Sequence, residues 1–261
     1  MTPEAADKLA AFFSTFAGGA KSLLLLDYDG TLAPFRVDRF TARPWAGVRE
    51  LLGRIQRQGR TRMVVVTGRP AKEVAPMLAL EKPLEVWGLH GAERFYPDGR
   101  RELEKAPAAT QKKIDELRRY LKRDSLGGLF EDKANGVVMH WRGRTPHAAK
   151  LIEQRTRVLF EPLAHMEGLA LLEFESGLEL RVGRNKGGAA KALLAEMDTR
   201  SPAAYLGDDL TDEMAFEAMK GRGLSVLVRR ELRKTEADIW LHPPAELRVF
   251  LEQWIEAGSR E

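Results

Sequence analysis

Two aspartates stand close together at the end of a run of leucines. The run Leu23–Leu26 leads into Asp27, Tyr28 and Asp29, and Gly30 follows. A short, fully apolar run predicts a strand that is buried on both faces, as in a parallel sheet. In an extended segment the two carboxylates project the same way and repel each other, unless a cation or a proton intervenes. The pair could therefore do chemistry or bind a metal ion, or it could simply be solvated.

Three further segments place polar residues beside predicted strands or at the start of a helix. Each has an ordinary structural explanation alone, such as a helix cap or a solvated lysine. Ligands of open α/β sheets, however, bind beyond the carboxyl ends of the strands, so such residues can meet at one site. They are Thr67, Gly68 and Arg69 after the apolar run Met63–Val66, Lys186 at the start of the helix that Asn185 is predicted to cap, and Asp208 and Asp212 after the apolar run Ala203–Leu206.

These residue types suit the hydrolysis of a phosphate ester, which needs a nucleophile, a proton donor and positive charge. Asp27 could accept the phosphoryl group as an aspartyl-phosphate. Asp29 could protonate the leaving oxygen and then deprotonate the attacking water, which requires it to carry a proton in the first step. Thr67 and the amide of Gly68 could hold phosphoryl oxygens, and Lys186 would supply compensating charge. These four side chains, Asp27, Asp29, Thr67 and Lys186, are the predicted catalytic residues.

The same aspartates predict a magnesium site. Mg²⁺ prefers hard oxygen ligands and few protein carboxylates. Asp27, the backbone carbonyl of Asp29 and Asp208 would suffice, with water and phosphate completing the shell. Asp212 would lie behind them and orient ligands or waters. The predicted metal residues are therefore Asp27, Asp29, Asp208 and Asp212, with Mg²⁺ as the cofactor.

Composition narrows the class of protein. The 261 residues include 42 Lys and Arg against 38 Asp and Glu, a net charge of +4, and 44% are hydrophobic. This mixed charge gives no basic stripe, so a small anionic substrate is expected and nucleic acid is not. The chain has no cysteine, which excludes disulfides and thiolate chemistry. Neither a signal peptide nor a transmembrane run is visible, so we expect a cytoplasmic protein with no membrane partner. We also expect a monomer.

The alternation of strands and helices predicts an α/β fold with a Rossmann-like parallel sheet. This core would comprise residues 1–100 and 181–261. Between them, residues 101–180 carry a different pattern of hairpins and helices, which predicts an inserted α+β domain. Both ends of the insert join the parallel-sheet domain, as expected of a cap.

A hairpin is predicted inside the insert, with Asn135-Gly136 as its two-residue turn. That turn would place Lys133 opposite Val138 and Glu131 opposite His140. One face would then carry polar residues and the other would pack on helices. A plain solvent-exposed sheet face explains this pattern as well as a binding surface does. The predicted polar residues are Glu131, Lys133, His140 and Arg142.

Taken together and in this order, the four polar segments resemble the signature motifs of the haloacid dehalogenase superfamily of phosphatases. Over residues 20–255 the chain further resembles the trehalose-6-phosphate phosphatase family. That resemblance implies hydrolysis of trehalose 6-phosphate, the last step of trehalose biosynthesis. The motifs that carry it are Asp27-Tyr-Asp-Gly-Thr-Leu, Glu131-Asp-Lys133 leading to His140-Trp-Arg142, Leu178-Glu179-Leu-Arg181 before Asn185-Lys186-Gly187, and Gly207-Asp-Asp-Leu-Thr-Asp-Glu213.

The resemblance also implies a haloacid dehalogenase core with a cap for substrate specificity, in which a Glu, Lys, Glu set grips the sugar hydroxyls. By motif position these are Glu131, Lys133 and Glu179, although Glu173 and Glu175 lie near the third. Trp141 stands where the family often has tyrosine. The full set of predicted substrate-binding residues is Gly68, Arg69, Glu131, Lys133, His140, Arg142 and Glu179.

Other functions stay open at this point. A phosphatase of the same superfamily could act on sucrose 6-phosphate or a glycosyl-phosphoglycerate, because specificity depends on pocket shape. A phosphotransferase or mutase would use the same motifs but suppress attack by water. A non-catalytic phosphosugar-binding protein predicts the loss of Asp27 or Asp29, and both are present.

Overall fold

The computed structural model describes residues 2–16, 21–36, 38–124, 127–133, 136–166, 168–174 and 176–259. The chain forms two compact units, one made of Met1–Glu102 with Asn185–Glu261 and one made of Leu103–Arg184. The boundary expected at residue 180 falls inside strand β9 (Gly177–Val182), so the chain returns to the first unit only after that strand has ended.

The first unit is built on a mostly parallel sheet, which confirms the predicted α/β class. Among the described residues its strand order is β12-β11-β10-β1-β2-β3-β4-β5. All neighbours from β12 to β3 are parallel, and β4 turns back antiparallel to β3. The strands are β1 (Ser22–Leu26), β2 (Thr61–Val66), β3 (Glu85–Gly88), β4 (Glu93–Phe95), β5 (Arg101–Leu103), β10 (Ala203–Gly207), β11 (Leu224–Val228) and β12 (Ile239–Leu241).

Helices cover both faces of this sheet. Leu24 and Leu26 of β1 pack into one core with helices α1, α2, α3 and α8, whereas Leu23 and Leu25 pack into a second core with α6 and α7. All four leucines are fully buried, so the prediction of a strand buried on both faces is confirmed. The helices are α1 (Pro3–Ser14), α2 (Val48–Gln58), α3 (Ala71–Leu78), α6 (Lys186–Ala195), α7 (Glu213–Met219) and α8 (Ala245–Gly258).

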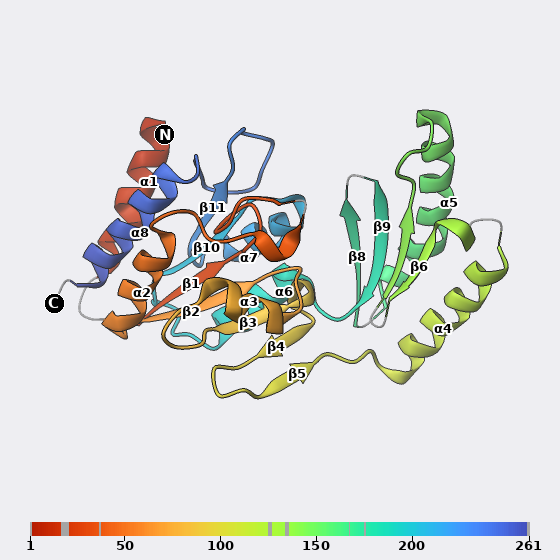
Figure 1. Cartoon of the computed structure of the whole chain (residues 1–261), viewed down its shortest axis with the longest axis horizontal. Helices are drawn as coiled ribbons and strands as arrows, with labels where there is room; N and C mark the ends of the chain where they lie inside the picture. Colours follow the sequence, from red (N-terminus) through yellow and green to blue (C-terminus); the bar gives the residue numbers. More distant parts are fainter. Residues whose placement is uncertain are drawn as a thin grey trace. The chain divides into compact units, whose positions relative to one another are not determined.

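The first and last helices of the chain lie side by side in the first unit (Figure 1). Phe13 of α1 contacts Phe250 and Trp254 of α8, with ring centroids 5.5 and 6.3 Å apart. Aromatic contacts of this kind add to the burial of apolar area. The two ends of the chain therefore close the same layer of the core.

The second unit is an antiparallel sheet with helices on one side. The strand order is β6-β7-β9-β8, and Ile114, Leu117 and Phe160 of the helices share a core with Val137 and Met139 of β7. Its other elements are α4 (Ala108–Arg123), β6 (Phe130–Lys133), β7 (Gly136–His140), α5 (Pro146–Ala164) and β8 (Leu169–Phe174).

The register of the predicted hairpin was wrong. Gly136 belongs to β7 and pairs with Lys133, and Glu131 pairs with Val138 rather than His140. The two-residue connection is therefore 134–135, and Asn135 of the predicted turn lies outside the described residues. Because the register moved by an even number of residues and side chains alternate with a period of two, the predicted faces are unchanged.

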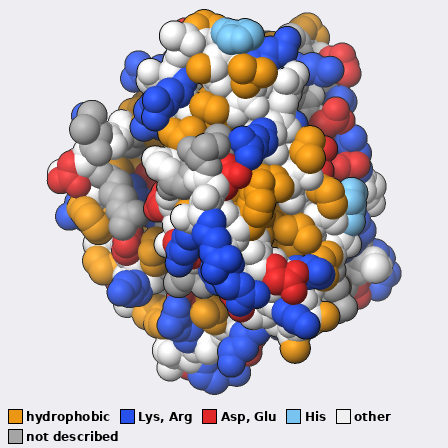
Figure 2. All heavy atoms as spheres, turned by 90° about the vertical axis from the view of Figure 1, so that its right-hand side faces the viewer, with side chains coloured by type: hydrophobic (Ala, Val, Ile, Leu, Met, Phe, Trp, Pro, Cys, Tyr) orange, Lys and Arg blue, Asp and Glu red, His pale blue; other side chains and the backbone are white. Residues whose placement is uncertain are grey.

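Charged side chains of both signs are distributed over the surface. On the face that Figure 2 shows, Lys and Arg lie among hydrophobic and acidic side chains. Within the described ranges, none of the helices is both long enough and apolar enough to cross a membrane.

Candidate active site

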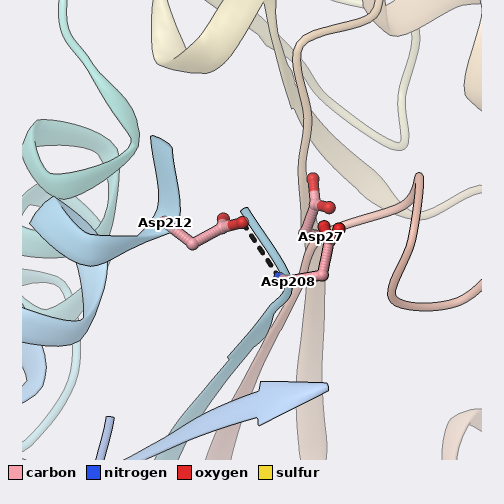
Figure 3. Close-up of side chains that lie close together, drawn as sticks. All are labelled: Asp27, Asp208 and Asp212. Carbon is pink, nitrogen blue, oxygen red and sulfur yellow. Dashed lines mark hydrogen bonds between the residues drawn. The ribbon is translucent and has the colours of Figure 1, made fainter. Parts of the chain in front are cut away.

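The carboxyl ends of β1 and β10, which are neighbours in the sheet, bring three aspartates together. Asp27 follows β1, and its amide donates to Leu206 O of β10 at 2.8 Å. Asp208 follows β10, and Asp212 is the last residue of the short helical turn Leu210–Asp212 that leads into α7. One carboxylate oxygen from each of Asp27, Asp208 and Asp212 lies within 4.8 Å of the others, and all three side chains are buried (Figure 3).

Lys186 joins this cluster from the first turn of α6. Its Nζ lies 2.7 Å from Asp27 Oδ1 and 2.8 Å from Asp212 Oδ1. The side chain of Asn185 accepts from the amide of Gly188 at 2.8 Å, as predicted for an N-cap, and so fixes where the helix and its lysine begin. A buried ammonium requires such paired carboxylates because an isolated charge in the interior is costly.

Every oxygen of Asp212 is engaged inside the protein. Oδ1 accepts from Lys186 Nζ and from the Tyr205 hydroxyl at 2.7 Å. Oδ2 accepts from the amides of Asp208 and Asp209 at 3.1 and 3.0 Å. Asp212 therefore holds the loop that carries Asp208 and is not free to be a principal metal ligand, in keeping with the position expected behind the site.

Burial controls the protonation of the cluster. It raises the pKa of Asp27 to about 7, an effect that the nearby Lys186 ammonium opposes and the Asp212 carboxylate increases. Burial, together with the charges of Asp27 and Asp212, raises the pKa of Asp208 to about 10. The same two carboxylates raise the pKa of Lys186 against the opposing effect of burial. Lys186 is thus cationic. The positive charge near Asp27 and Asp208 is too small to keep the pKa values of these two buried carboxyl groups in their ordinary range.

The donor set fits a hard divalent cation. Asp208 Oδ1 is buried and has no hydrogen-bond partner among the described residues, so it can accept a ligand bond. Gly30, with φ of +85°, makes room for this carboxylate, because a Cβ at that position would lie 2.1 Å from Asp208 Oδ2. Carboxylate oxygens without histidine or cysteine suit Mg²⁺. Asp27 and Asp208 are the side chains best placed to hold it.

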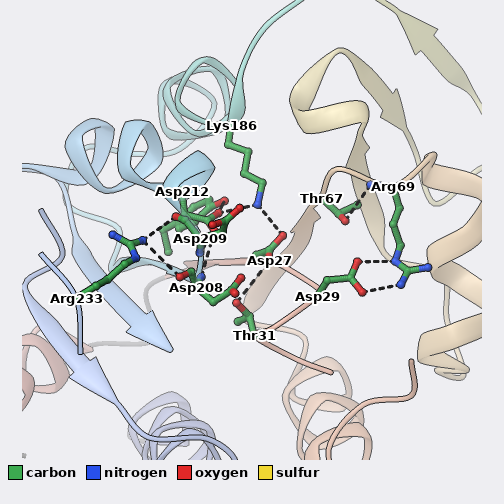
Figure 4. A network of polar contacts seen from close by, with 11 residues as sticks. Asp27, Asp29, Thr31, Thr67, Arg69, Lys186, Asp208, Asp209, Asp212 and Arg233 are labelled. Atoms are coloured by element: carbon green, nitrogen blue, oxygen red, sulfur yellow. Dashed lines mark hydrogen bonds and ion pairs between the residues drawn. The ribbon is translucent and has the colours of Figure 1, made fainter. Parts of the chain in front are cut away.

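Asp29 is paired with an arginine. Its carboxylate receives two hydrogen bonds from Arg69, Nε to Oδ2 and Nη2 to Oδ1, both of 2.6 Å (Figure 4). Strand β1 ends at Leu26, yet Asp27 and Asp29 still line the same pocket, as their spacing predicts. Because Arg69 holds both carboxylate oxygens of Asp29, its backbone carbonyl, rather than its carboxylate, is the candidate metal ligand.

Thr67, Gly68 and Arg69 follow β2, the other neighbour of β1. The Thr67 hydroxyl is buried and accepts from the amide of Arg69 at 3.2 Å, which makes a tight turn. This turn lines one pocket of about 300 Å³ together with Asp27, Asp29, Asp208 and Lys186. The structure therefore brings all the predicted phosphate-side residues of the first unit into one place.

The second unit gathers most of the other predicted residues on one sheet face. Glu131 and Glu179 both lie opposite Val138 on its two sides. Lys133 Nζ lies 3.6 Å from Glu179 Oε2, and His140 Nε2 lies 2.8 Å from Glu131 Oε2. These contacts define a polar sheet face made of Glu131, Lys133, His140 and Glu179.

Arg142 and the alternative glutamates are placed differently. Arg142 lies past the end of β7 and is exposed. Glu173 pairs with Leu178, on the opposite side of the sheet from Glu179, and forms an ion pair with Arg157 of α5 at 2.8 Å. Glu175 lies outside the described residues. Among the described glutamates, Glu179 is therefore the one that joins Glu131 and Lys133.

Three residues near these groups were not predicted. Arg181 makes two hydrogen bonds to Glu179, of 2.9 and 2.6 Å. Arg233 donates to Asp209 O at 2.8 Å and so stabilises the loop that carries Asp208 and Asp209. His90 lines the pocket that contains Asp27, Thr67 and Lys186. Period-two spacing from Glu179 could have indicated Arg181, and the sequence Gly88-Leu-His90-Gly91 directly after a strand could have indicated His90.

Solved structures share this fold. A haloacid dehalogenase-like hydrolase from B. subtilis superposes with a TM-score of 0.60 at 17% identity, over 88% of this chain and 99% of that one. Trehalose-6-phosphate phosphatase from Aspergillus fumigatus superposes with a TM-score of 0.76 at 25% identity, over 95% of this chain and 97% of that one. The fold is that of the haloacid dehalogenase-like hydrolases.

Sequence comparison identifies the family of this chain within that fold. The family model described as trehalose-phosphatase matches residues 25–238, and the chain belongs to this family. Trehalose-phosphate phosphatase from Mycolicibacterium paratuberculosis is 29% identical over 99% of this chain and 68% of that protein. Its counterpart from Mycobacterium marinum is 28% identical, over 87% of this chain and 60% of that protein. The chain thus spans about two thirds or less of the length of these relatives.

Proposed function

We propose that the protein hydrolyses trehalose 6-phosphate to trehalose and phosphate. One observation carries the proposal: the buried contact of 2.7 Å between Lys186 Nζ and Asp27 Oδ1, at the edge of a pocket that also contains Thr67 and Gly68. A lysine paired with a carboxylate in such a pocket suits a nucleophile that must meet a dianion. The substrate assignment is supported by membership in the trehalose-phosphatase family.

In the first step Asp27 attacks phosphorus, and the bond between phosphorus and the sugar oxygen breaks. Lys186 fixes the rotation of the Asp27 carboxylate, while Thr67 and the Gly68 amide hold phosphoryl oxygens. Asp29 gives its proton to the departing sugar oxygen. In the second step Asp29 takes a proton from water, and the resulting hydroxide attacks phosphorus, which releases phosphate and restores Asp27.

Magnesium is the proposed cofactor. Asp27, Asp208 and the backbone carbonyl of Asp29 would hold it, and Asp212 would orient the loop of Asp208. The unpartnered Asp208 Oδ1 supports this set. A bound Mg²⁺ would neutralise phosphoryl charge and help to align the ester.

The second unit is proposed to recognise the sugar. Its polar sheet face offers carboxylates and an ammonium, which are suitable partners for hydroxyl groups. Glu131, Lys133 and Glu179 would grip the disaccharide, with His140 and Arg142 beside them. Arg181 would hold Glu179 in its rotamer through their two hydrogen bonds. Residues 101–180 would in this way act as a cap that sets specificity.

Phosphate release tests the proposal. The protein with Mg²⁺ is assayed on trehalose 6-phosphate, sucrose 6-phosphate, glucose 6-phosphate and a glycosyl-phosphoglycerate, beside the Asp27→Asn variant. We expect a strong preference for trehalose 6-phosphate that is abolished by the substitution and by a chelator. A preference for another ester would reject the substrate assignment, and phosphate release that survives Asp27→Asn would reject the mechanism.

A further inference from the structure

A short segment after β3 lies between the two elements that carry the phosphate-side residues. The amide of Leu89 donates to Arg69 O at 2.9 Å, and the amide of His90 donates to Thr67 O at 2.8 Å. On the other side Gly91 is so close to α6 that a Cβ there would lie 2.8 Å from Asn185 O. The segment 89–91 therefore contacts both the turn that holds Thr67 and the start of the helix that holds Lys186.

The backbone of this segment is strained. Leu89 and His90 have φ of 50° and 58°, and Gly91 has φ of 111°. Residues with a Cβ adopt this left-handed region only at an energetic cost. Strain of this kind persists where the surrounding structure holds it, and it concentrates at functional sites. The two amide hydrogen bonds to Thr67 O and Arg69 O are what hold it here.

The imidazole of His90 lies against Gly68. An added Cβ on Gly68 would come within 2.5 Å of His90 Nε2 and 2.7 Å of its Cε1. The ring also lines the pocket that contains Asp27, Thr67 and Lys186. The left-handed turn is thus what directs the side chain of residue 90 back over Gly68 and into the phosphate pocket.

We propose that His90 is a positioning residue for the phosphate site: its ring holds Gly68 so that the Gly68 amide keeps its direction into the pocket. The inference rests on the proposed function only in assigning a phosphoryl group to this pocket. Because the ring acts on the phosphate side, its loss should weaken every phosphate monoester alike, and inorganic phosphate too. A role in sugar recognition would affect trehalose 6-phosphate alone.

His90→Gly removes the ring and relieves the backbone. Ala79→Gly is the matched control, because Ala79 is exposed, lies outside the pocket and has φ of 48°. We expect both variants to keep the melting temperature within about 3 °C. Only His90→Gly should weaken inorganic phosphate binding, measured by calorimetry, and kcat/KM for p-nitrophenyl phosphate, by roughly 10–100-fold. Equal behaviour of the two variants overturns the inference.

A double-mutant cycle tests the contact with Gly68 directly. Gly68→Ala should lower kcat/KM strongly in the natural background, where its Cβ meets the ring. In the His90→Gly background the same substitution should cost at least fivefold less, because the space is free; coupling of this size is ordinary for groups in contact. Additive effects would overturn the proposal.

These readouts separate the two proposals. If the protein hydrolyses p-nitrophenyl phosphate but not trehalose 6-phosphate, the proposed substrate fails while the cycle still tests His90. If trehalose 6-phosphate is hydrolysed and the cycle is additive, the proposed function stands and the role of His90 is rejected.

Discussion

The Arg69 guanidinium grips the Asp29 carboxylate through two hydrogen bonds of equal length, 2.6 Å each. The planar guanidinium matches a carboxylate in this geometry, which a lysine could not reproduce. In this arrangement both oxygens of Asp29 are occupied. The proposed proton transfer to a leaving sugar oxygen would therefore require Asp29 to release at least one of these hydrogen bonds.

Substitution of Asp29 should affect substrates according to their leaving groups. Asp29→Asn should lower kcat on trehalose 6-phosphate by roughly 10²–10⁴-fold, because a sugar alkoxide needs a proton to depart. Nitrophenolate departs without one, so p-nitrophenyl phosphate should still phosphorylate Asp27. Water activation is lost with both substrates. Rapid mixing should therefore show a stoichiometric burst of nitrophenolate followed by slow turnover.

The matched control for that experiment is Asp7→Asn, an exposed carboxylate on α1 that should leave both rates unchanged. Equal loss of the first step with both substrates would show that Asp29 does not act as the proton donor.

Asp27→Asn should abolish turnover and stabilise the metal-free protein at alkaline pH. Burial raises the pKa of Asp27 to about 7 in the folded protein, well above its ordinary value of 3.8. The folded state then binds more protons than the unfolded state between these values, so stability falls as pH rises through this window. The variant lacks this penalty. Its melting temperature should exceed that of the natural protein at pH 8, and the difference should shrink towards pH 4.

Activity gives the second readout for Asp27→Asn. An amide cannot serve as this nucleophile, so kcat should fall by about 10³-fold or more. A difference in melting temperature that grows as pH falls would contradict the assigned direction of the pKa.

Magnesium should stabilise the protein more at high pH than at low pH. The pKa of Asp208 is raised to about 10 and that of Asp27 to about 7, so protons compete with the cation. At a concentration of 100 times Kd, Mg²⁺ adds about 2.7 kcal/mol of stability. The rise in melting temperature on adding Mg²⁺ to chelator-treated protein should be larger at pH 8 than at pH 5.5.

The control for this titration is potassium chloride at equal ionic strength, and Asp208→Asn should remove the response to Mg²⁺. If the variant keeps the full response, the cation binds elsewhere.

Substitutions on the polar sheet face of the second unit should discriminate between substrates. Glu179→Gln and Lys133→Ala should each raise KM for trehalose 6-phosphate by roughly 10–100-fold, since a charged hydrogen bond to a hydroxyl contributes about 1.5–3 kcal/mol. The KM for p-nitrophenyl phosphate should not change, because this substrate has no sugar. Steady-state kinetics on both substrates measure the split.

Glu173→Gln is the matched control, because Glu173 lies on the opposite side of the same sheet. If Glu173→Gln raised KM for trehalose 6-phosphate and Glu179→Gln did not, the sugar site would have to be moved to the other face.

The sequence predicted those parts of the fold that local patterning determines. An apolar run that faces the core on both sides can be recognised in the sequence, and β1 lies where Leu23–Leu26 predicted it. Residues at the ends of adjacent parallel strands meet for topological reasons, which is why Asp27 and Asp208 could be placed together. The faces of the β6–β7 hairpin were also correct.

Other features depend on contacts that no local pattern encodes. The partner of Asp29 is 40 residues away in the chain, so this contact could not be derived from spacing alone. The hairpin register depended on which two residues made the turn; Asn135-Gly136 was a plausible choice, but Gly136 lies in β7 and pairs with Lys133 and Arg181. His90 was missed because its importance arises from a left-handed backbone, which leucine and histidine rarely adopt.

The discontinuity of the first unit has a consequence for synthesis on the ribosome. Strand β1 lies between β2 and β10, and β10 begins only at Ala203. One edge of the fully buried strand β1 must therefore wait until the second unit, which is continuous from Leu103 to Arg184, has emerged. An unpaired apolar edge is open to association with other chains. Prompt folding of the insert shortens the path that brings β10 back, so the segment proposed to select the sugar would also protect the nascent core from aggregation.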